Sequence, residues 1–295
     1  MAPASRIAIP MPHSTDLEYS ERAIPQYERA VALAGGEPVR VPLDQSANEI
    51  RKLVQGCDGV LLPGSKADVD PARFNAARSP HTAAADPRRD AVDDLLLDDA
   101  YRQRKPVLGI CYGLQSLNVY RAGSLVQHIP DFLPEGTRAK VNHEAGRTVA
   151  VAHSVEIVAD SRLARVVGGR TNNTSGAKAP IDEELAIAAL EALRHPKPGH
   201  QTKVTSDTKV TSDPGPHPGS LVIPVNSSHH QSAEAIGDGL RIVARCPDDG
   251  IIEALEGIAP DHFVLAVQWH PERSVEEDAV SRAIFDALIV AARRH

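Results

Sequence analysis

A cysteine lies between two glycines in the segment Val107–Asn118, VLGICYGLQSLN. An apolar run typical of a buried strand leads into the cysteine, and a helix is expected directly after it. Gly109 and Gly113 would leave room for the sharp turn between the two elements. The pattern predicts that Cys111 is a nucleophile at a helix N-terminus, where the helix dipole favours a thiolate and the N–H of Tyr112 faces a developing oxyanion. A buried structural cysteine is the alternative, and it is the interpretation we give to Cys57 and Cys246, which lack such surroundings.

A histidine and a carboxylate that could serve this cysteine follow a second apolar run, in FVLAVQWHPERS at 263–274. Pro271 ends the strand, so His270 is expected at its carboxyl end, the edge of an open α/β sheet where sites form and where Cys111 is also expected. Glu272 can accept from one ring nitrogen and leave the other to take the thiol proton. The chain has 13 histidines, so a surface histidine beside a turn is the alternative. The combined pattern favours a triad of Cys111, His270 and Glu272.

The elements that must position these residues alternate between short apolar runs and amphipathic stretches, which is typical of an α/β domain with an open, mainly parallel sheet flanked by helices. In the first half we expect strands at 6–10, 38–41, 59–62 and 106–110, and helices at 21–34, 48–55, 89–104 and 112–120. The second half has a more antiparallel character. It is expected to contain strands at 155–158, 221–225, 240–244, 251–255 and 264–268, followed by a last helix at 275–292.

One stretch departs from this alternation. Between Gly168 and Gly219 the composition shifts to Gly, Pro, Ser, Thr, Lys and His, and the hexapeptide TKVTSD occurs twice in succession. Such a segment buries too little apolar surface to offset its ordering entropy. We therefore predict one domain over residues 1–295, interrupted by a flexible insertion at about 168–219 with a helix at 182–194 and a mobile loop at 196–218. The insertion is either a lid or docking element or a tolerated surface insertion, and the low cost of long loops favours the second.

Length and composition narrow the class of protein. A chain of 295 residues with 24% charged and 42% hydrophobic residues has the profile of a globular protein with a substantial core. A 3% aromatic content and a formal charge of −7 argue against a nucleic-acid partner. Three cysteines without a C-x-x-C pair fit a reducing compartment and suggest neither a disulfide framework nor a zinc–thiolate site. With no signal-peptide pattern and no run of about 20 apolar residues, we expect a cytoplasmic protein with no membrane partner.

Together these motifs resemble a known family. GICYGLQ and QWHPE are similar to the Cys-His-Glu motifs of the class I glutamine amidotransferase fold. The more discriminating segments are LLPGSKADVDPARF at 61–74, VNSSHHQ at 225–231 and GLRIVARCPDDGIIEALE at 239–256, which resemble the γ-glutamyl-γ-aminobutyrate hydrolase family, peptidase C26. The resemblance covers nearly the whole chain apart from the insertion. It implies a flavodoxin-like, mainly parallel sheet flanked by helices, with a smaller antiparallel sheet.

The resemblance also implies roles for residues outside the triad. Gly64 would provide a second oxyanion N–H beside that of Tyr112, and Gln115 would help to hold the glutamyl end of the substrate. The turn at 226–231, with Ser227, Ser228 and His229, would line the pocket for the α-amino and α-carboxylate groups. Turn polarity and packing are the alternative for His229 and His230. Asp68 and Asp70 would either face an amine-bearing leaving group or form an ordinary turn. No metal or organic cofactor is implied.

The activity that follows from this resemblance is hydrolysis of a small γ-glutamyl amine, such as γ-glutamyl-γ-aminobutyrate, through a thioester on Cys111. One alternative is a glutaminase subunit that supplies ammonia to a separate synthetase. A second is a non-catalytic binding or regulatory protein on the same fold, against which the intact Cys, His and Glu argue. The sequence leaves open the amine, which could derive from γ-aminobutyrate, another polyamine-derived amine or an amino acid. It also leaves open whether the chain forms a homo-oligomer.

Overall fold

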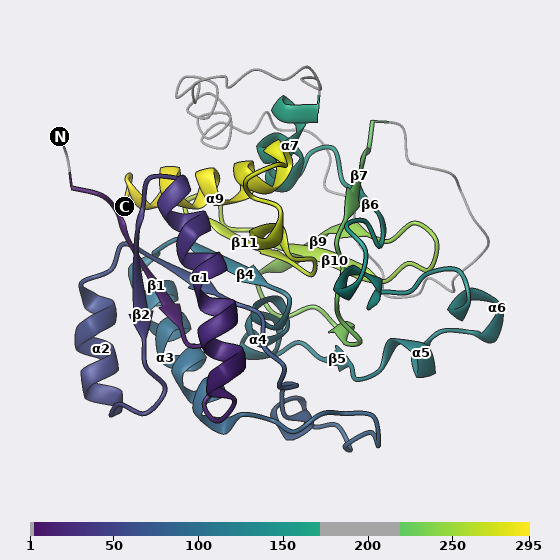
Figure 1. The fold of residues 1–295 in the computed structure, drawn as a ribbon, viewed down its shortest axis with the longest axis horizontal. Coiled ribbons are helices and arrows are strands. Elements are labelled where there is room, and N and C mark those ends of the chain that lie inside the picture. The colour runs from purple at the N-terminus through teal and green to yellow at the C-terminus, as the bar shows by residue number, and fades with distance from the viewer. Residues whose placement is uncertain (1–2, 172–218) are drawn as a thin grey trace.

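The computed structural model describes residues 3–171 and 219–295, which form a nine-stranded sheet in the order β2-β1-β3-β4-β11-β10-β9-β6-β7 (Figure 1). The parallel half contains β1 (Arg6–Pro10), β2 (Glu37–Val41), β3 (Gly59–Leu62), β4 (Val107–Ile110) and β11 (Val264–Val267). The antiparallel half contains β6 (His153–Ile157), β7 (Leu221–Val225), β9 (Leu240–Arg245) and β10 (Ile252–Gly257). A small antiparallel sheet pairs β5 (Leu125–Val126) with β8 (Ser232–Ala233).

The expected fold is confirmed, with one correction to the second half. The strand predicted at 264–268 is not part of the antiparallel region, because β11 pairs in parallel with β4, Val267 opposite Ile110. The other predicted antiparallel strands extend the main sheet, and the separate small sheet is formed by β5 and β8 instead. This arrangement places β4 and β11 side by side with their carboxyl ends at the same edge.

Helices cover both faces of the sheet because successive strand residues point to opposite sides. In β1, Ile7 and Ile9 belong to the apolar layer that α1 (Leu17–Leu33), α7 (Arg162–Thr171) and α9 (Ala279–Ala292) cover, whereas Ala8 packs on the opposite face. That opposite face is covered by α2 (Ala47–Gln55), α3 (Pro87–Gln103) and α4 (Tyr112–Tyr120). The fully apolar strands β3 and β4 are thus buried on both sides, as expected for the centre of a doubly covered sheet.

Side-chain caps set where the helices begin. The helix predicted from residue 21 begins at Leu17, because the Asp16 side chain accepts from the Tyr19 N–H at 2.9 Å, and Pro25 is tolerated inside the helix. The last helix begins at Ala279 rather than at 275, because Asp278 accepts from the N–H groups of Val280 and Ser281.

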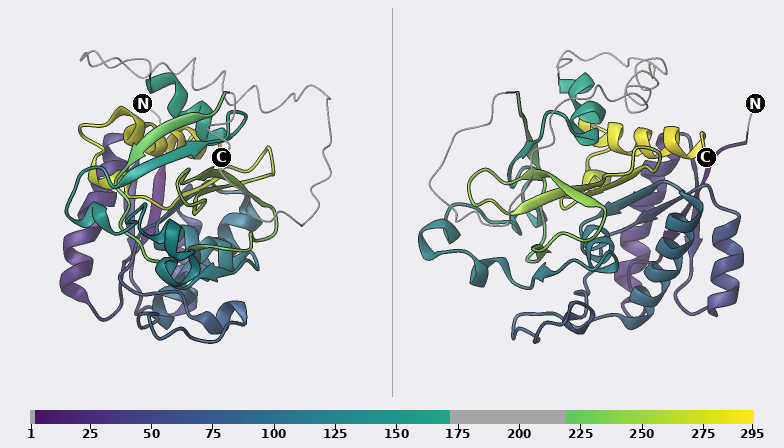
Figure 2. Two further views of the ribbon diagram at one scale, coloured as in Figure 1. Left: turned by 90° about the vertical axis from the view of Figure 1, so that its right-hand side faces the viewer. Right: turned by 180° about the vertical axis from the view of Figure 1, so that it is seen from behind.

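Short helical turns complete the described chain: α5 (Ile129–Phe132), α6 (Glu135–Arg138), and the 3₁₀ turns η1 (Pro71–Phe74), η2 (Ala145–Arg147) and η3 (Pro271–Arg273). The segment with α5 and α6 lies at the end of the molecule farthest from α2, as the views from the front and from behind show (Figures 1 and 2). Of the predicted insertion, residues 168–171 form the end of α7. The helix predicted at 182–194 and the loop predicted at 196–218 lie outside the described residues. Within 3–171 and 219–295, no helix has the length and apolar character needed to cross a bilayer.

Candidate active site

Cys111 occupies the turn between β4 and α4. Its N–H donates to the Val267 carbonyl of β11 at 2.8 Å, and its own carbonyl accepts from Leu114 and Gln115 in the first turn of α4. The backbone at Cys111 has φ 54° and ψ −105°, a conformation that residues other than glycine rarely adopt. Such strain persists only where the surrounding structure enforces it, and it is concentrated at functional sites. Cys111 lies at the amino end of the helix and is largely buried.

The two glycines on either side of Cys111 are needed for close packing. A Cβ atom on Gly113 would lie 2.2 Å from the Leu62 carbonyl oxygen at the end of β3, and one on Gly109 would lie 2.8 Å from the Gly113 carbonyl oxygen. Both distances are shorter than any ordinary contact, so neither position accepts a larger residue without movement of the backbone. The clearance expected from the sequence is therefore confirmed.

His270 and Glu272 follow β11, the strand adjacent to β4. The His270 Nδ1 atom lies 2.7 Å from Glu272 Oε1, and both His270 Cε1 and Cys111 Cβ lie within 3.7 Å of the position that a Cβ atom on Gly64 would take. Asn226 holds the histidine backbone on both sides: its Oδ1 accepts from the His270 N–H at 3.0 Å, and its Nδ2 donates to the His270 carbonyl at 2.9 Å. The three predicted triad residues are thus brought together at one edge of the sheet.

Charge interactions within the triad shift its protonation. Burial alone would lower the pKa of His270, but the charges of Glu272 and Cys111 outweigh it and raise the pKa to about 9. Burial would raise the pKa of Glu272, yet the imidazolium of His270 lowers it below its usual value. The pair therefore favours an ionised carboxylate beside a protonated imidazole, which can supply a proton to a leaving group.

Gly64, in the loop after β3, lies close to Cys111 and His270. A Cβ atom there would lie 3.1 Å from His270 Cε1 and 3.7 Å from Cys111 Cβ. Its N–H donates to the hydroxyl of Tyr27 at 3.0 Å, so an oxyanion would have to share or displace this contact. Burial raises the pKa of Tyr27 well above 10, which keeps the hydroxyl neutral. The sequence did not indicate that Tyr27 contacts Gly64, because Tyr27 is one of several regularly spaced buried residues of α1.

Tyr112 begins α4, so its N–H is one of the donors at a helix start that have no acceptor within the helix. Its side chain is held by two residues of α3: the hydroxyl donates to Asp90 Oδ1 at 2.6 Å, and the ring lies under the guanidinium of Arg89. Arg89 is fully buried, binds Asp93 at 2.7 Å and donates to the carbonyl of Pro63 at 2.7 Å. Arg89 thereby fixes the residue before Gly64, a role that the sequence did not indicate.

Several of the residues predicted to contact substrate already have partners within the protein. Gln115 is buried and its Nε2 donates to the Gln231 carbonyl at 3.2 Å and to Gln268 Oε1 at 3.4 Å. Ser227 is buried with no hydrogen bond to its hydroxyl, and Ser228 is partly exposed. Their contacts with a substrate remain predictions.

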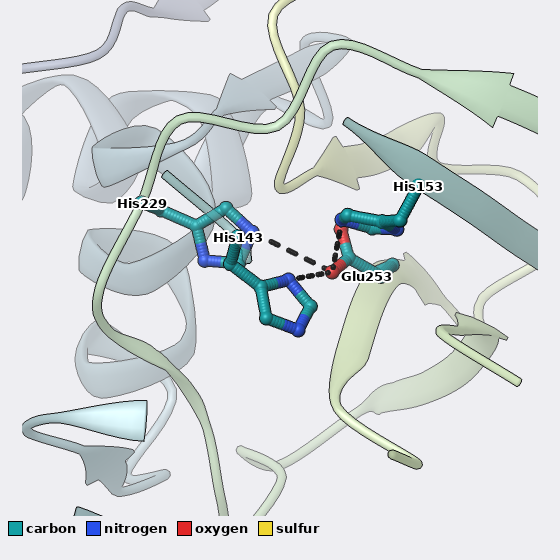
Figure 3. A group of neighbouring side chains, drawn as sticks. All are labelled: His143, His153, His229 and Glu253. Carbon is teal, nitrogen blue, oxygen red and sulfur yellow. Dashed lines mark ion pairs between the residues drawn. The ribbon is translucent and has the colours of Figure 1, made fainter. Parts of the chain in front are cut away.

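The two histidines of the same turn face different neighbours. His229 is buried, with Nδ1 2.9 Å from the Gln231 carbonyl oxygen and Nε2 3.5 Å from Glu253 Oε1, so both ring nitrogens face protein atoms (Figure 3). His230 Nε2 lies 3.0 Å from Asp68 Oδ1, a contact that raises the pKa of His230. Asp68 thus binds the turn at 226–231.

Asp70 has a local role. Its side chain accepts from the Ala72 N–H at 3.0 Å and caps η1, as in the ordinary turn that the sequence offered as an alternative.

Comparison with known proteins identifies relatives along nearly the whole chain. The family model of peptidase C26 matches residues 7–192 and 187–272. A protein of Rickettsia prowazekii provisionally named as glutamine amidotransferase-like is 29% identical over 276 residues, which cover 90% of this chain and 88% of the relative. The γ-glutamyl-γ-aminobutyrate hydrolase PuuD of Escherichia coli K12 is 28% identical over 278 residues, covering 92% and 86%. A solved Thermoplasma acidophilum structure, provisionally named as part of a GMP synthase, shares the fold with a TM-score of 0.54 at 14% identity, covering 100% of this chain and 96% of the other.

Proposed function

Because the chain belongs to the peptidase C26 family, we propose that it is a cysteine-dependent hydrolase of γ-glutamyl amide bonds. The contacts that carry the proposal are those of His270, whose Nδ1 lies 2.7 Å from Glu272 Oε1 and whose Cε1, like Cys111 Cβ, lies within 3.7 Å of the position that a Cβ atom on Gly64 would take. A nucleophile, a base and a group that orients the base are the minimum that thioester chemistry needs.

The proposed reaction has two steps. The Cys111 thiolate, formed by transfer of the thiol proton to His270, attacks the γ-carbonyl carbon of a γ-glutamyl amide, and the oxyanion of the tetrahedral intermediate accepts from the N–H groups of Tyr112 and Gly64. The C–N bond then breaks as the imidazolium of His270 gives its proton to the departing amine, which leaves a glutamyl thioester. In the second step His270 takes a proton from water, the hydroxide attacks the thioester, and the C–S bond breaks to release glutamate and the Cys111 thiolate beside the imidazolium of His270.

The proposed substrate is a small γ-glutamyl amine. The 28% identity to the E. coli γ-glutamyl-γ-aminobutyrate hydrolase over 92% of this chain supports a substrate of that class. The hydrogen bond between His230 and Asp68, at 3.0 Å, joins the two segments on which the resemblance to that family most depends. We therefore expect this pair to form part of the wall that faces the amine.

A panel of γ-glutamyl amides tests the proposal. It should contain γ-glutamyl-γ-aminobutyrate, a γ-glutamyl polyamine, a γ-glutamyl amino acid and free glutamine, and released glutamate is measured. We expect turnover of at least one γ-glutamyl amine and none by the Cys111→Ala variant, with an unchanged melting temperature. Activity retained in that variant would contradict the assignment. Turnover of free glutamine alone would instead favour a glutaminase subunit.

Labelling with a glutamine-like electrophile tests the nucleophile without knowledge of the amine. Intact mass should show one adduct on the wild-type chain and none on Cys111→Ala. Burial raises the pKa of both other thiols, Cys57 and Cys246, so neither is expected to react. Cys57→Ala, at the end of α2, is the matched control and should be labelled at the wild-type rate.

A further inference from the structure

Four buried polar side chains converge in the antiparallel half of the molecule. His143 lies in the loop after α6, His153 in β6, His229 in the turn after β7, and Glu253 in β10 (Figure 3). Their exposed fractions are 4%, 8%, 3% and 0%. All four ligand-type atoms lie within 4.8 Å of one another. Ionisable groups are almost never buried so completely unless they pair or coordinate a metal.

The inner atoms of this group face one another without making hydrogen bonds. The distances to Glu253 Oε1 are 3.1 Å from His143 Nδ1, 3.5 Å from His153 Nε2 and 3.5 Å from His229 Nε2. None of these nitrogens, and neither oxygen of Glu253, has a hydrogen-bond partner with acceptable geometry. Several buried polar atoms left unpaired at one place are costly, and one missing partner at their common centre would satisfy them together.

In each ring one nitrogen, the inner one, faces Glu253, and the other, the outer one, has a different partner. The partner of the outer nitrogen shows whether the inner nitrogen carries a proton or a lone pair. His153 Nδ1 lies 3.0 Å from the Ser154 carbonyl oxygen, and His229 Nδ1 lies 2.9 Å from the Gln231 carbonyl oxygen. A carbonyl only accepts, so both Nδ1 atoms carry the proton, and in the neutral rings Nε2 presents a lone pair to the centre. The outer nitrogen of His143 faces a carboxylate, Asp249 Oδ2 at 2.8 Å. Outer contacts to carbonyl and carboxylate groups are those made by metal-binding histidines.

The geometry points to a structural Zn²⁺ site formed by His143, His153, His229 and Glu253. A tetrahedral zinc ion bound to nitrogen and oxygen at its usual bond lengths places its ligand atoms about 3.3 to 3.5 Å apart. The three nitrogen–oxygen distances, 3.1 to 3.5 Å, are close to these edges. Ca²⁺ and Mg²⁺ prefer sets of oxygen ligands, so three imidazoles disfavour them. Four protein ligands close the coordination shell, which is typical of a structural rather than a catalytic zinc.

Protonation of the histidines accounts for the group less well than a metal ion does. A proton on His143, between Asp249 and Glu253, would satisfy one inner nitrogen but leave the lone pairs of His153 and His229 facing a carboxylate. Among the described residues, a second group of His143, Cys246 and Asp249 shares one histidine, and burial raises the pKa of its thiol, which disfavours a thiolate ligand.

A third group, His81, His128 and Asp131, is largely exposed to solvent. It lacks the enclosed coordination shell of the four buried side chains.

The proposed ion would hold in place the turn at 226–231, which contacts residues of the candidate active site. His229 belongs to the same turn as Asn226, whose amide holds the backbone of His270, and as Gln231, whose carbonyl accepts from Gln115. A cavity of about 220 Å³, lined by His143 and His229 among others, adjoins the cluster and offers a route for the ion. Zinc would thus act as a positioning element for His270 without touching the reacting atoms.

Metal analysis of the full chain tests the proposal. After expression in zinc-supplemented medium and extensive dialysis, elemental analysis should find about one equivalent of zinc per chain. X-ray absorption at the zinc edge should show nitrogen and oxygen neighbours and no sulfur. Zinc below about 0.1 equivalent after incubation with added Zn²⁺, or sulfur among its neighbours, would overturn the proposal.

Variants identify the ligands. His153→Gln and Glu253→Gln should each lose bound zinc, and Asp249→Asn should weaken zinc affinity about 10- to 100-fold. His262→Gln is the matched control, because His262 is also buried and bound to a carbonyl but lies outside the cluster. It should keep its zinc. Full zinc retention in the two ligand variants would contradict the assignment.

If the ligand variants fail to fold, the wild-type chain gives an independent measurement. Removal of the ion with a chelator should lower the melting temperature by at least about 5 °C, and Zn²⁺ but not Mg²⁺ should restore it. Equal melting temperatures before and after removal would refute a structural role. None of these measurements depends on the proposed γ-glutamyl activity, so the two proposals stand or fall separately.

Discussion

Replacement of Gly113 by alanine should damage catalysis far more than folding. The added Cβ would lie 2.2 Å from the Leu62 carbonyl oxygen, 2.7 Å from Leu62 Cβ and 2.8 Å from its carbonyl carbon. These are backbone atoms and the first atom of a side chain, so they cannot rotate away. To reach an ordinary contact, the start of α4 and the end of β3 must separate by about 1 Å.

That separation acts on the site directly. Leu62 is two residues before Gly64, and Gly113 follows Tyr112, so the movement draws apart the two N–H groups proposed to bind the oxyanion. Loss of one such donor costs about 100- to 1000-fold in kcat, and a 1 Å misplacement costs about 100-fold. Overpacking a core contact costs about 1–3 kcal/mol, which a domain with about 5–15 kcal/mol of stability survives.

The assay pairs two measurements on Gly113→Ala. Glutamate release from the best γ-glutamyl amide should fall about 100-fold or more in kcat, while urea unfolding still shows a cooperative transition. Gly136→Ala, in α6, is the matched control, because its new methyl group meets no atom within 4 Å. It should keep wild-type activity. A Gly113→Ala variant with wild-type kcat would refute the reasoning.

Three further predictions concern buried charges. Glu272→Gln removes the carboxylate 2.7 Å from His270 and should lower kcat about 100- to 10,000-fold with little change in KM; a loss below tenfold would contradict its orienting role. Asp93→Ala leaves the fully buried Arg89 without its carboxylate and should lower the free energy of unfolding by about 3–5 kcal/mol in urea titrations, whereas a change below about 1 kcal/mol would show that the pair is not needed. The pKa of His270 is raised from 6.5 to about 9, so its proton stabilises the fold below pH 6.5 and this stabilisation disappears as pH rises through 9. Relative to His270→Gln, the wild-type free energy of unfolding should therefore fall by up to about 3 kcal/mol over that window, and a flat difference would contradict the shift.

The sequence predicted the sheet and the grouping of Cys111, His270 and Glu272 because their signals are local. Gly109, Cys111 and Gly113 lie within five residues, and His270 and Glu272 are separated only by a proline. Apolar runs such as 59–62 and 107–110 are bounded by turn residues, so their limits were nearly correct. The helix starts were less accurate where a cap decided them, as at Asp16 and Asp278, because several aspartates near each start could have served.

Features that depend on contacts between distant residues were not predictable. Tyr27 reaches Gly64 across 37 positions, and Asn226 reaches His270 across 44. His143, His153, His229 and Glu253 show no metal-ligand spacing, because the strand order of the antiparallel half, not the sequence, brings them together. Pairing of β6 with β9 and of β9 with β10 brings the strands that carry His153 and Glu253 into one sheet.

Strand direction reverses between β11 and β10, so different parts of the candidate site follow strands of the parallel half and of the antiparallel half. Cys111 and His270 follow parallel strands, whereas the turn at 226–231, which binds the His270 backbone through Asn226, follows β7 of the antiparallel half. In principle such a turn could be grafted from a relative to alter which amine is accepted while the reacting groups stay in place. The paired hydrogen bonds from Asn226 to the His270 backbone limit that freedom, so a transplanted turn would need to keep an amide at this position.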